Sequence, residues 1–298
     1  MNLRATGVHR RRALVTGYRV ARAAAARVGV QFVVKSYYSP IPDLRALPPD
    51  VWDRRSELRG VAFDREAAYD RLEGVLARYG GELAPGDPIP LPNDTYSWGD
   101  AHLLHAMVRE LKPARIHELG SGFSTLLIAG ACRRNAAEGA PAHYEVVDPY
   151  PTVAPPGTPG VTSFRREPAE RLPLDWFASL GAGDVLFVDT THTVKLGSDV
   201  NWIVLDVLPS LAPGVVVHFH DIFLPYEYPR QWARDFGLYW SEQYLLQAFL
   251  SGNAEWEMLC PLQAYCREEP ARFRAALPAA PEGTAGGAFW IRRRPEQH

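Results

Sequence analysis

The sequence predicts an α/β fold with a mostly parallel sheet covered by helices on both faces, and three observations support this. From about residue 114 onward, short apolar runs alternate with helical stretches. The runs are continuously apolar, as in strands buried on both faces, rather than alternating with polar residues. The first run ends in a glycine-containing turn, HELGSGFST, that leads directly into a helix. Strand, crossover helix and strand in this order are typical of a parallel sheet.

Seven runs are expected to be strands. They are 115–119, 143–148, 161–167, 184–190, 215–221, 255–260 and 288–293. Helices are expected between them, with the clearest at 123–136, 198–211 and 241–251. In parallel sheets ligands bind at the carboxyl ends of the strands, so the residues that follow each strand are the first candidates for a site.

The chain before the sheet differs in character. Helix 64–79 places Ala68, Leu72, Val75 and Leu76 on one face, and Pro-rich loops surround it. We therefore expect two parts. Residues 1–90 form a mainly helical, Pro-rich extension that covers the site, and residues 91–298 form the sheet domain.

Composition narrows the class of protein. The 298 residues are 47% hydrophobic and carry a net charge of −2, which disfavours nucleic acid as the main partner. No apolar stretch reaches the ~20 residues that cross a bilayer. The three cysteines, Cys132, Cys260 and Cys266, lack metal-site spacing and are expected to be free thiols in a reducing cytoplasm.

The N-terminal region is basic. Residues 1–42 hold eight Lys or Arg and no Asp or Glu, and 10–28 are expected to form an Ala-rich helix. Arg19, Arg22 and Arg27 interrupt the apolar core that a signal peptide needs. A solvated helix packed on its own domain is favoured over a helix that binds an anionic surface. This helix and two aromatic, Pro-containing loops, 37–43 and 223–232, would also suit a homodimer.

The turn after the first strand indicates a nucleoside ligand. Gly120 and Gly122 allow a tight turn and a close approach to the backbone at a helix start. Thr125 stands where a dinucleotide fingerprint has its third glycine, and Glu118 would repel phosphate, so a cationic ligand is favoured. Asp148, at the end of the second strand, can accept hydrogen bonds from both ribose hydroxyls.

This E-x-G-x-G turn, followed by an acid after the next strand, resembles the class I S-adenosylmethionine-dependent methyltransferases. The resemblance implies a Rossmann-like, seven-stranded sheet of order 3-2-1-4-5-7-6 that closes in an antiparallel hairpin. It also implies that S-adenosyl-L-methionine binds at Glu118, Gly120, Ser121, Gly122 and Asp148.

The fourth and fifth strands end in polar groups. DTTHT offers Asp189 and His192, and HFHDI offers His220 and Asp221. If the two strands are neighbours, these side chains meet at one site, because adjacent strands lie ~4.8 Å apart. Carboxylates buried together repel each other, and a divalent cation would remove that cost. His218 faces the same side of its strand as His220 and is expected to be a hydrogen-bonded core histidine.

These strand ends resemble the metal-dependent sugar O-methyltransferases of macrolide biosynthesis and the related cephalosporin-hydroxylase group. The resemblance implies that Asp189 and Asp221 bind a metal and that His192 is the general base. His220 stands where that group has Glu. As a third ligand it would shift the preference from Mg²⁺ toward Mn²⁺, Fe²⁺ or Zn²⁺, and an arrangement in which the histidines act without a metal also stays open.

From SYYSPIPD to the last strand, the chain resembles a widespread bacterial group of class I methyltransferase-like proteins. The function expected is metal-assisted O-methylation of a small molecule (a sugar, polyol or phenol of natural-product metabolism), with Asp189 and His192 catalytic. The alternative is a metal-dependent enzyme on the same fold that does not methylate, such as a non-haem iron oxygenase. A non-catalytic nucleoside-binding protein is the third reading.

Overall fold

The structure is a computed structural model that describes residues 16–31, 33, 35–83 and 96–295. The chain divides into two compact units, Met1–Pro48 and Pro49–His298. In the first unit residues 16–26 are helical, inside the basic helix expected at 10–28, whose first residues lie outside the described part. The domain boundary expected at residue 90 also lies outside it.

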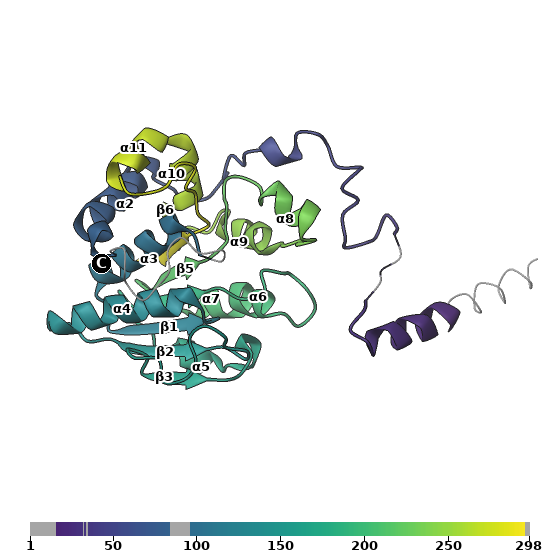
Figure 1. Ribbon diagram of the computed structural model, residues 1–298, viewed down its shortest axis with the longest axis horizontal. Helices are drawn as coiled ribbons and strands as arrows, with labels where there is room; N and C mark the ends of the chain where they lie inside the picture. The colour runs from purple at the N-terminus through teal and green to yellow at the C-terminus, as the bar shows by residue number, and fades with distance from the viewer. Residues whose placement is uncertain (1–15, 32, 34, 84–95, 296–298) are drawn as a thin grey trace, which may run out of the picture. The chain divides into compact units, whose positions relative to one another are not determined.

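The second unit is built on one seven-stranded sheet of order β3-β2-β1-β4-β5-β7-β6, so the predicted fold is confirmed. The strands are β1 (Arg115–Leu119), β2 (His143–Val147), β3 (Ser163–Arg165), β4 (Val185–Val188), β5 (Val216–Phe219), β6 (Trp256–Pro261) and β7 (Phe289–Arg293). The strands β3, β2, β1, β4 and β5 run parallel to one another, while β7 is antiparallel to both β5 and β6. Figure 1 shows β1, β2 and β3 side by side at one end of this sheet.

Alternate residues of the strands face two separate cores. Val185 and Phe187 of β4 belong to one core, and Leu186 and Val188 to the other. The first core is covered by α2 (Arg65–Tyr79), α3 (Trp98–Leu111) and α4 (Phe123–Ala137). The second is covered by α5 (Leu174–Phe177), α6 (Asp199–Trp202), a π-helical turn (Ile203–Val207), α7 (Leu208–Ser210) and α9 (Glu242–Leu250). Burial on both faces is what the unbroken apolar strands predicted.

The remaining elements lie around this centre. α8 (Arg230–Asp235) belongs to the loop after β5, and α10 (Leu262–Glu268) and α11 (Pro270–Ala276) lie beside α2 (Figure 1). Short 3-10 turns occur at Val51–Asp53, Gly80–Glu82 and Ala169–Arg171. α2 buries the predicted stripe Ala68, Leu72, Val75 and Leu76. Among the helices of the described residues, none is both long and apolar enough to cross a membrane.

The strand register aligns the carboxyl ends of the parallel strands. Leu119 of β1 is level with Val147 of β2 and with Val188 of β4, and Val188 is level with Phe219 of β5. The next residue of each strand therefore stands in one row along this edge of the sheet. That row is Gly120, Asp148, Asp189 and His220, which brings all four predicted strand ends together.

Candidate active site

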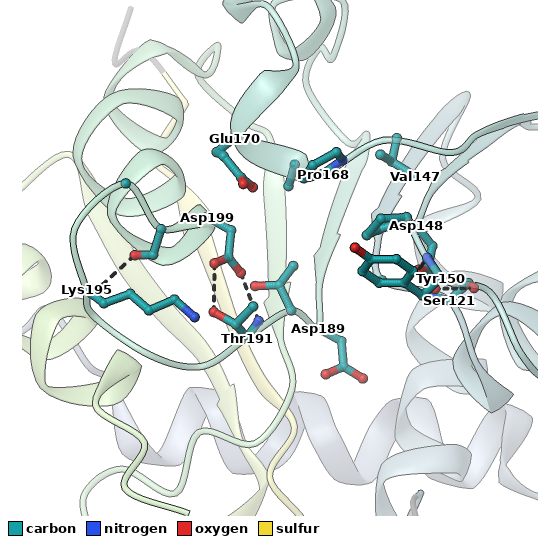
Figure 2. Close-up of a pocket in the computed structure, with 16 residues that line it drawn as sticks. Ser121, Val147, Asp148, Tyr150, Pro168, Glu170, Asp189, Thr191, Lys195 and Asp199 are labelled. Atoms are coloured by element: carbon teal, nitrogen blue, oxygen red, sulfur yellow. Dashed lines mark hydrogen bonds between the residues drawn. The ribbon is translucent and has the colours of Figure 1, made fainter. Parts of the chain in front are cut away.

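A pocket of about 540 Å³ opens along this row. Its lining comes from the ends of β1, β2 and β4, from the turn before the 3-10 helix at 169–171, and from the loop between β4 and α6. In Figure 2 Asp189 lies between two groups of side chains, with Ser121 and Asp148 on one side and Thr191 and Asp199 on the other. Such a concave, largely pre-formed pocket with a few convergent polar groups is the usual form of a small-molecule site.

The first turn and Asp148 are joined by hydrogen bonds. Asp148 Oδ2 accepts from the Ser121 backbone N–H (2.9 Å) and hydroxyl (2.5 Å), and Oδ1 accepts from the Tyr150 N–H (2.7 Å). The carboxylate is thereby fixed at the rim of the pocket. Because an ionised carboxylate offers about four acceptor positions, it keeps capacity for a ligand hydroxyl.

The two glycines of the turn serve different needs. Gly120 has φ +86, and a Cβ there would stand 1.8 Å from the backbone oxygen of Asp189. Only glycine lets the end of β4 approach the turn so closely. A Cβ on Gly122 would meet nothing within 4 Å. The protein's own packing therefore does not require a glycine at 122, and open space remains beside the start of α4.

Glu118 lies beneath the turn rather than in the lining of the pocket. It is fully buried and accepts hydrogen bonds from the Ser124 hydroxyl (2.8 Å) and from the Tyr144 hydroxyl. Burial raises the pKa of Glu118 to about 8, although these two hydrogen bonds oppose the shift. Through Ser124 the side chain is bonded to the start of α4, directly after the turn. Its predicted contact with the donor stays a prediction.

His192 is held between two carboxylates. Its Nε2 lies 3.1 Å from Asp189 Oδ1, and its Nδ1 lies 2.8 Å from Glu242 Oε2. The carbonyl oxygen of His192 also accepts the backbone N–H groups of Ser241 (2.9 Å) and Glu242 (3.1 Å) at the start of α9. The ring of Trp240 packs against the imidazole at 4.2 Å. Ring and backbone are thus both fixed by the segment that begins α9.

The protonation of this group follows from its surroundings. Burial lowers the pKa of His192, but hydrogen bonds to Asp189 and Glu242 outweigh it and raise the pKa to about 10. Burial alone would raise the pKa of Asp189, but His220 and His192 lower it well below its usual range. Both shifts favour the charged pair, with an imidazolium at His192 and a carboxylate at Asp189. Asp189 lines the pocket, whereas His192 stands behind it.

His220 lies on the other side of Asp189. Its Nδ1 is 3.4 Å from Asp189 Oδ2 and 3.5 Å from Asp221 Oδ2, and its Nε2 is 3.7 Å from Asp100 Oδ2. The ring of Tyr96 stacks on the imidazole at 4.5 Å. Burial lowers the pKa of His220, but the carboxylates of Asp221 and Asp189 raise it more, to well above its usual range.

The spacing of these side chains bears on whether they could hold a metal ion. In the described part of the chain, no three His, Cys, Asp or Glu side chains are placed to hold a metal together. Asp189, His220 and Asp221, the set predicted from the resemblance, instead face one another as ion-paired neighbours. As placed, they do not fit a metal, and we assign no metal ligand.

His218 is a core residue, as predicted. It packs between Phe187 (4.5 Å between ring centres) and Trp290 (4.6 Å). Within the residues that the structure describes, neither ring nitrogen has a hydrogen-bond partner, so the expected hydrogen bond is not seen. Burial holds the pKa of His218 well below its usual range.

Backbone strain is concentrated here. Four described residues other than glycine have positive φ, and His192 (φ 54) and Asp221 (φ 58) are two of them. A left-handed backbone costs energy for a residue with a side chain, and such residues gather at functional sites.

Sequence reasoning missed Glu242 and the position of Asp100 beside His220. Glu242 is buried at the start of α9, on the same face as Leu246 and Leu250. The sequence could have indicated this position, because Glu242 stands four residues before Leu246, in line with the buried leucines of the helix. Asp100 is buried, and its carboxylate accepts hydrogen bonds from the Ser97 hydroxyl (2.7 Å) and the Ala288 N–H (2.7 Å).

Comparison with protein families gives a match over the central part of the chain. Residues 117–222 match the model of a family described as a methyltransferase domain. The predicted resemblance to methyltransferases is confirmed. The matched stretch runs from β1 to just beyond β5 and contains Asp148, Asp189 and His220. It supports an S-adenosylmethionine-dependent methyltransferase.

Solved structures give a weaker likeness. An apo structure of CmcI-N160 is 14% identical, with 72% of this chain and 83% of that chain covered and a TM-score of 0.41. The S-adenosylhomocysteine-bound methyltransferase PaMTH1 of Podospora anserina is 17% identical, with 76% and 88% covered and a TM-score of 0.38. With scores this low we draw nothing further from them. Comparison with curated proteins gives no match.

Proposed function

We propose that this protein transfers the methyl group of S-adenosylmethionine to a hydroxyl group of a small molecule. The observation that carries the proposal is the position of Asp189 in one pocket with the Gly120–Ser121 turn and Asp148. A donor bound through its ribose at Asp148 would have its sulfonium on the Asp189 side of the turn. The acceptor hydroxyl would then meet the methyl group beside a carboxylate.

The charge of the pocket suits this donor. Its lining includes four carboxylates, Asp148, Glu170, Asp189 and Asp199, and one cation, Lys195. A cleft with an excess of one sign of charge raises the local concentration of the opposite sign. S-adenosylmethionine carries a sulfonium cation that the product S-adenosylhomocysteine lacks, so the pocket favours the reactive form of the donor.

The proton of the acceptor has a nearby destination. Methyl transfer forms the new C–O bond as the S–C bond breaks, and the hydroxyl proton must leave. An imidazolium whose two N–H groups both face carboxylates cannot accept it, so we place the proton on Asp189 and give His192 the task of holding that carboxylate. The hydroxyl becomes strongly acidic as the bond forms, so a weakly basic carboxylate suffices. No step passes through a metal.

The expected contributions are ordinary for such a reaction. Alignment of donor and acceptor can supply about 7–11 kcal/mol of the barrier reduction. A positioned proton acceptor adds a factor of about 10²–10⁴.

We further propose a ring-bearing acceptor, such as a sugar, cyclic polyol or phenol. Tyr228, Trp232 and Trp240 lie in the segment that leads from β5 to α9, and Trp240 contacts His192. Trp232 and Trp240 are only partly buried, with ring centres 4.8 Å apart. These rings lie beside His192 rather than in the lining of the pocket, and partly exposed aromatic rings suit a flat or sugar-like ligand.

Calorimetric titration of S-adenosylhomocysteine tests the donor site. We expect the wild type to bind and Asp148→Ala to bind at least tenfold more weakly. Asp206→Ala removes an exposed aspartate outside the pocket and serves as the control. A folded wild-type protein that binds neither S-adenosylmethionine nor S-adenosylhomocysteine would overturn the proposal. With binding established, radiolabelled donor and a panel of hydroxyl compounds identify the acceptor.

A further inference from the structure

Three carboxylates surround the side chain of His220. The Nδ1 edge of the ring faces Asp189 and Asp221, and the Nε2 edge faces Asp100. The ring is buried and is fixed in its plane by the stacked ring of Tyr96. A single imidazole is therefore the common neighbour of all three acids.

Each acid is held in place independently of His220. Asp100 accepts hydrogen bonds from the Ser97 hydroxyl and the Ala288 N–H. Asp189 is paired with His192 through Oδ1. The backbone of Asp221 is left-handed, and the Ile222 N–H that follows it donates to the Gly287 carbonyl (3.0 Å), so the backbone that carries this carboxylate is held beside His220. Three carboxylates held around one buried ring favour a cation among them.

A divalent ion and a side-chain cation are two solutions to the same electrostatic problem. For Asp189 the side-chain solution uses both oxygens, since Oδ1 faces His192 Nε2 and Oδ2 faces His220 Nδ1. A metal shared by Asp189 and Asp221 would have to lie where the Nδ1 edge of His220 now faces both of them. The described residues offer no group of three that could hold a metal elsewhere in the cluster.

We propose that the His220 side chain takes the place of a divalent cation between Asp100, Asp189 and Asp221, so that this protein binds no metal there. The proposal concerns the cation of the cluster and holds whichever acceptor is methylated. The imidazole of His220 at the end of β5 would then balance the charge of the carboxylates around it.

The first test is a titration of Mn²⁺ into chelator-treated full-length protein, followed by the electron paramagnetic resonance signal of free Mn²⁺. We expect no stoichiometric site in the wild type at millimolar Mn²⁺. One equivalent of bound Mn²⁺ that is lost in Asp221→Asn would overturn the proposal. The S-adenosylhomocysteine titration runs beside it, so that failure of the donor site and failure of this inference are read separately.

The second test replaces the cation. His220→Glu adds a fourth carboxylate, and we expect this variant to bind Mn²⁺ at least tenfold more tightly than the wild type and to gain thermal stability from it. His220→Gln is the matched control, similar in size but without the added charge, and it should gain neither. A folded His220→Glu variant with no gain in Mn²⁺ binding contradicts the proposal.

A third comparison covers the case in which His220→Glu does not fold. His220→Gln removes the cation and leaves the carboxylates uncompensated, so its Tm should fall. Adding Asp221→Asn removes one of those charges and should restore part of the loss, whereas Asp221→Asn alone in the wild type should not stabilise. Additive effects in this double-mutant cycle would show that His220 does not balance the acids.

Discussion

Glu242 Oε2 lies 2.8 Å from His192 Nδ1, on the opposite edge of the ring from Nε2, which faces Asp189 at 3.1 Å. Both side chains of the Glu242–His192 pair are buried. A buried carboxylate behind an imidazole fixes the orientation of the ring and keeps its proton on the bonded nitrogen. Asp189 is thereby held at the pocket by a helix that contributes no residue to the lining.

Replacing Glu242 with Gln is expected to lower kcat roughly tenfold or more while leaving the affinity for S-adenosylhomocysteine unchanged. Gln keeps the size of the side chain but loses the charge that holds His192 protonated. The pH profile of kcat should therefore shift as well. Glu282→Gln, at an exposed site, is the control. If Glu242→Gln lowered donor affinity and kcat by the same factor, Glu242 would have only a structural role.

The two glycines of the first turn should respond differently to alanine. Gly120→Ala places a Cβ on the Asp189 carbonyl oxygen and on a positive φ, so it should prevent folding or lower the Tm by many degrees. Gly122→Ala meets no protein atom and should fold with nearly wild-type stability. If a nucleoside approaches the backbone there, Gly122→Ala will nevertheless weaken S-adenosylhomocysteine binding. Calorimetry on both variants, with circular dichroism melts, decides this.

Glu118 and His192 each lower the stability as the pH rises, whereas the lowered pKa values of His117 and His218 act in the opposite sense below pH 6.5. Glu118 has a pKa of about 8 in the folded protein and 4.5 when unperturbed, so its contribution is full below 4.5 and is lost between 4.5 and 8. His192, at about 10 against 6.5, loses its contribution between 6.5 and 10. Each group changes the free energy of unfolding by at most about 1.4 kcal/mol per pH unit.

Glu118→Gln separates the two contributions. The variant mimics the protonated carboxyl, so its free energy of unfolding in urea should rise relative to that of the wild type as the pH goes from 4.5 to 6.5. The decline above pH 6.5 should remain, because His192 and His220, whose pKa values are both raised, still contribute to it. An identical slope for both proteins from pH 5 to 6.5 would mean that Glu118 is already ionised in the fold.

Much of the fold could be predicted because buried parallel strands leave a strong pattern in the sequence. The strands 115–119 and 143–148 agree with β1 and β2 within a residue. The run 161–167 is longer than β3, Ser163–Arg165, because an edge strand has a partner on one side only. The single helix expected at 198–211 is divided into α6, a π-helical turn and α7.

The site was predictable where it depends on the strands. Asp189, His192, His220 and Asp221 meet because β4 and β5 are neighbours, which the strand order implied. Glu242 could not be placed beside His192, because that contact depends on how α9 returns across the loop after β4. The buried hydrogen bond of Glu118 could not be predicted either, because its partner Tyr144 comes from the neighbouring strand β2.

Asp189→Asn should change the affinity for the donor, S-adenosylmethionine, more than the affinity for the product, S-adenosylhomocysteine. The substitution keeps the shape of the side chain but removes the carboxylate that faces the expected position of the sulfonium. S-adenosylmethionine should therefore lose affinity, on the order of tenfold, relative to uncharged S-adenosylhomocysteine. kcat should fall by about 10²–10⁴ because the proton acceptor is gone. Asp206→Asn is the matched control, and both ligands are titrated into both variants. Parallel changes for the two ligands would place the sulfonium away from Asp189, and an acceptor hydroxyl beside that carboxylate would then lie out of line with the methyl group.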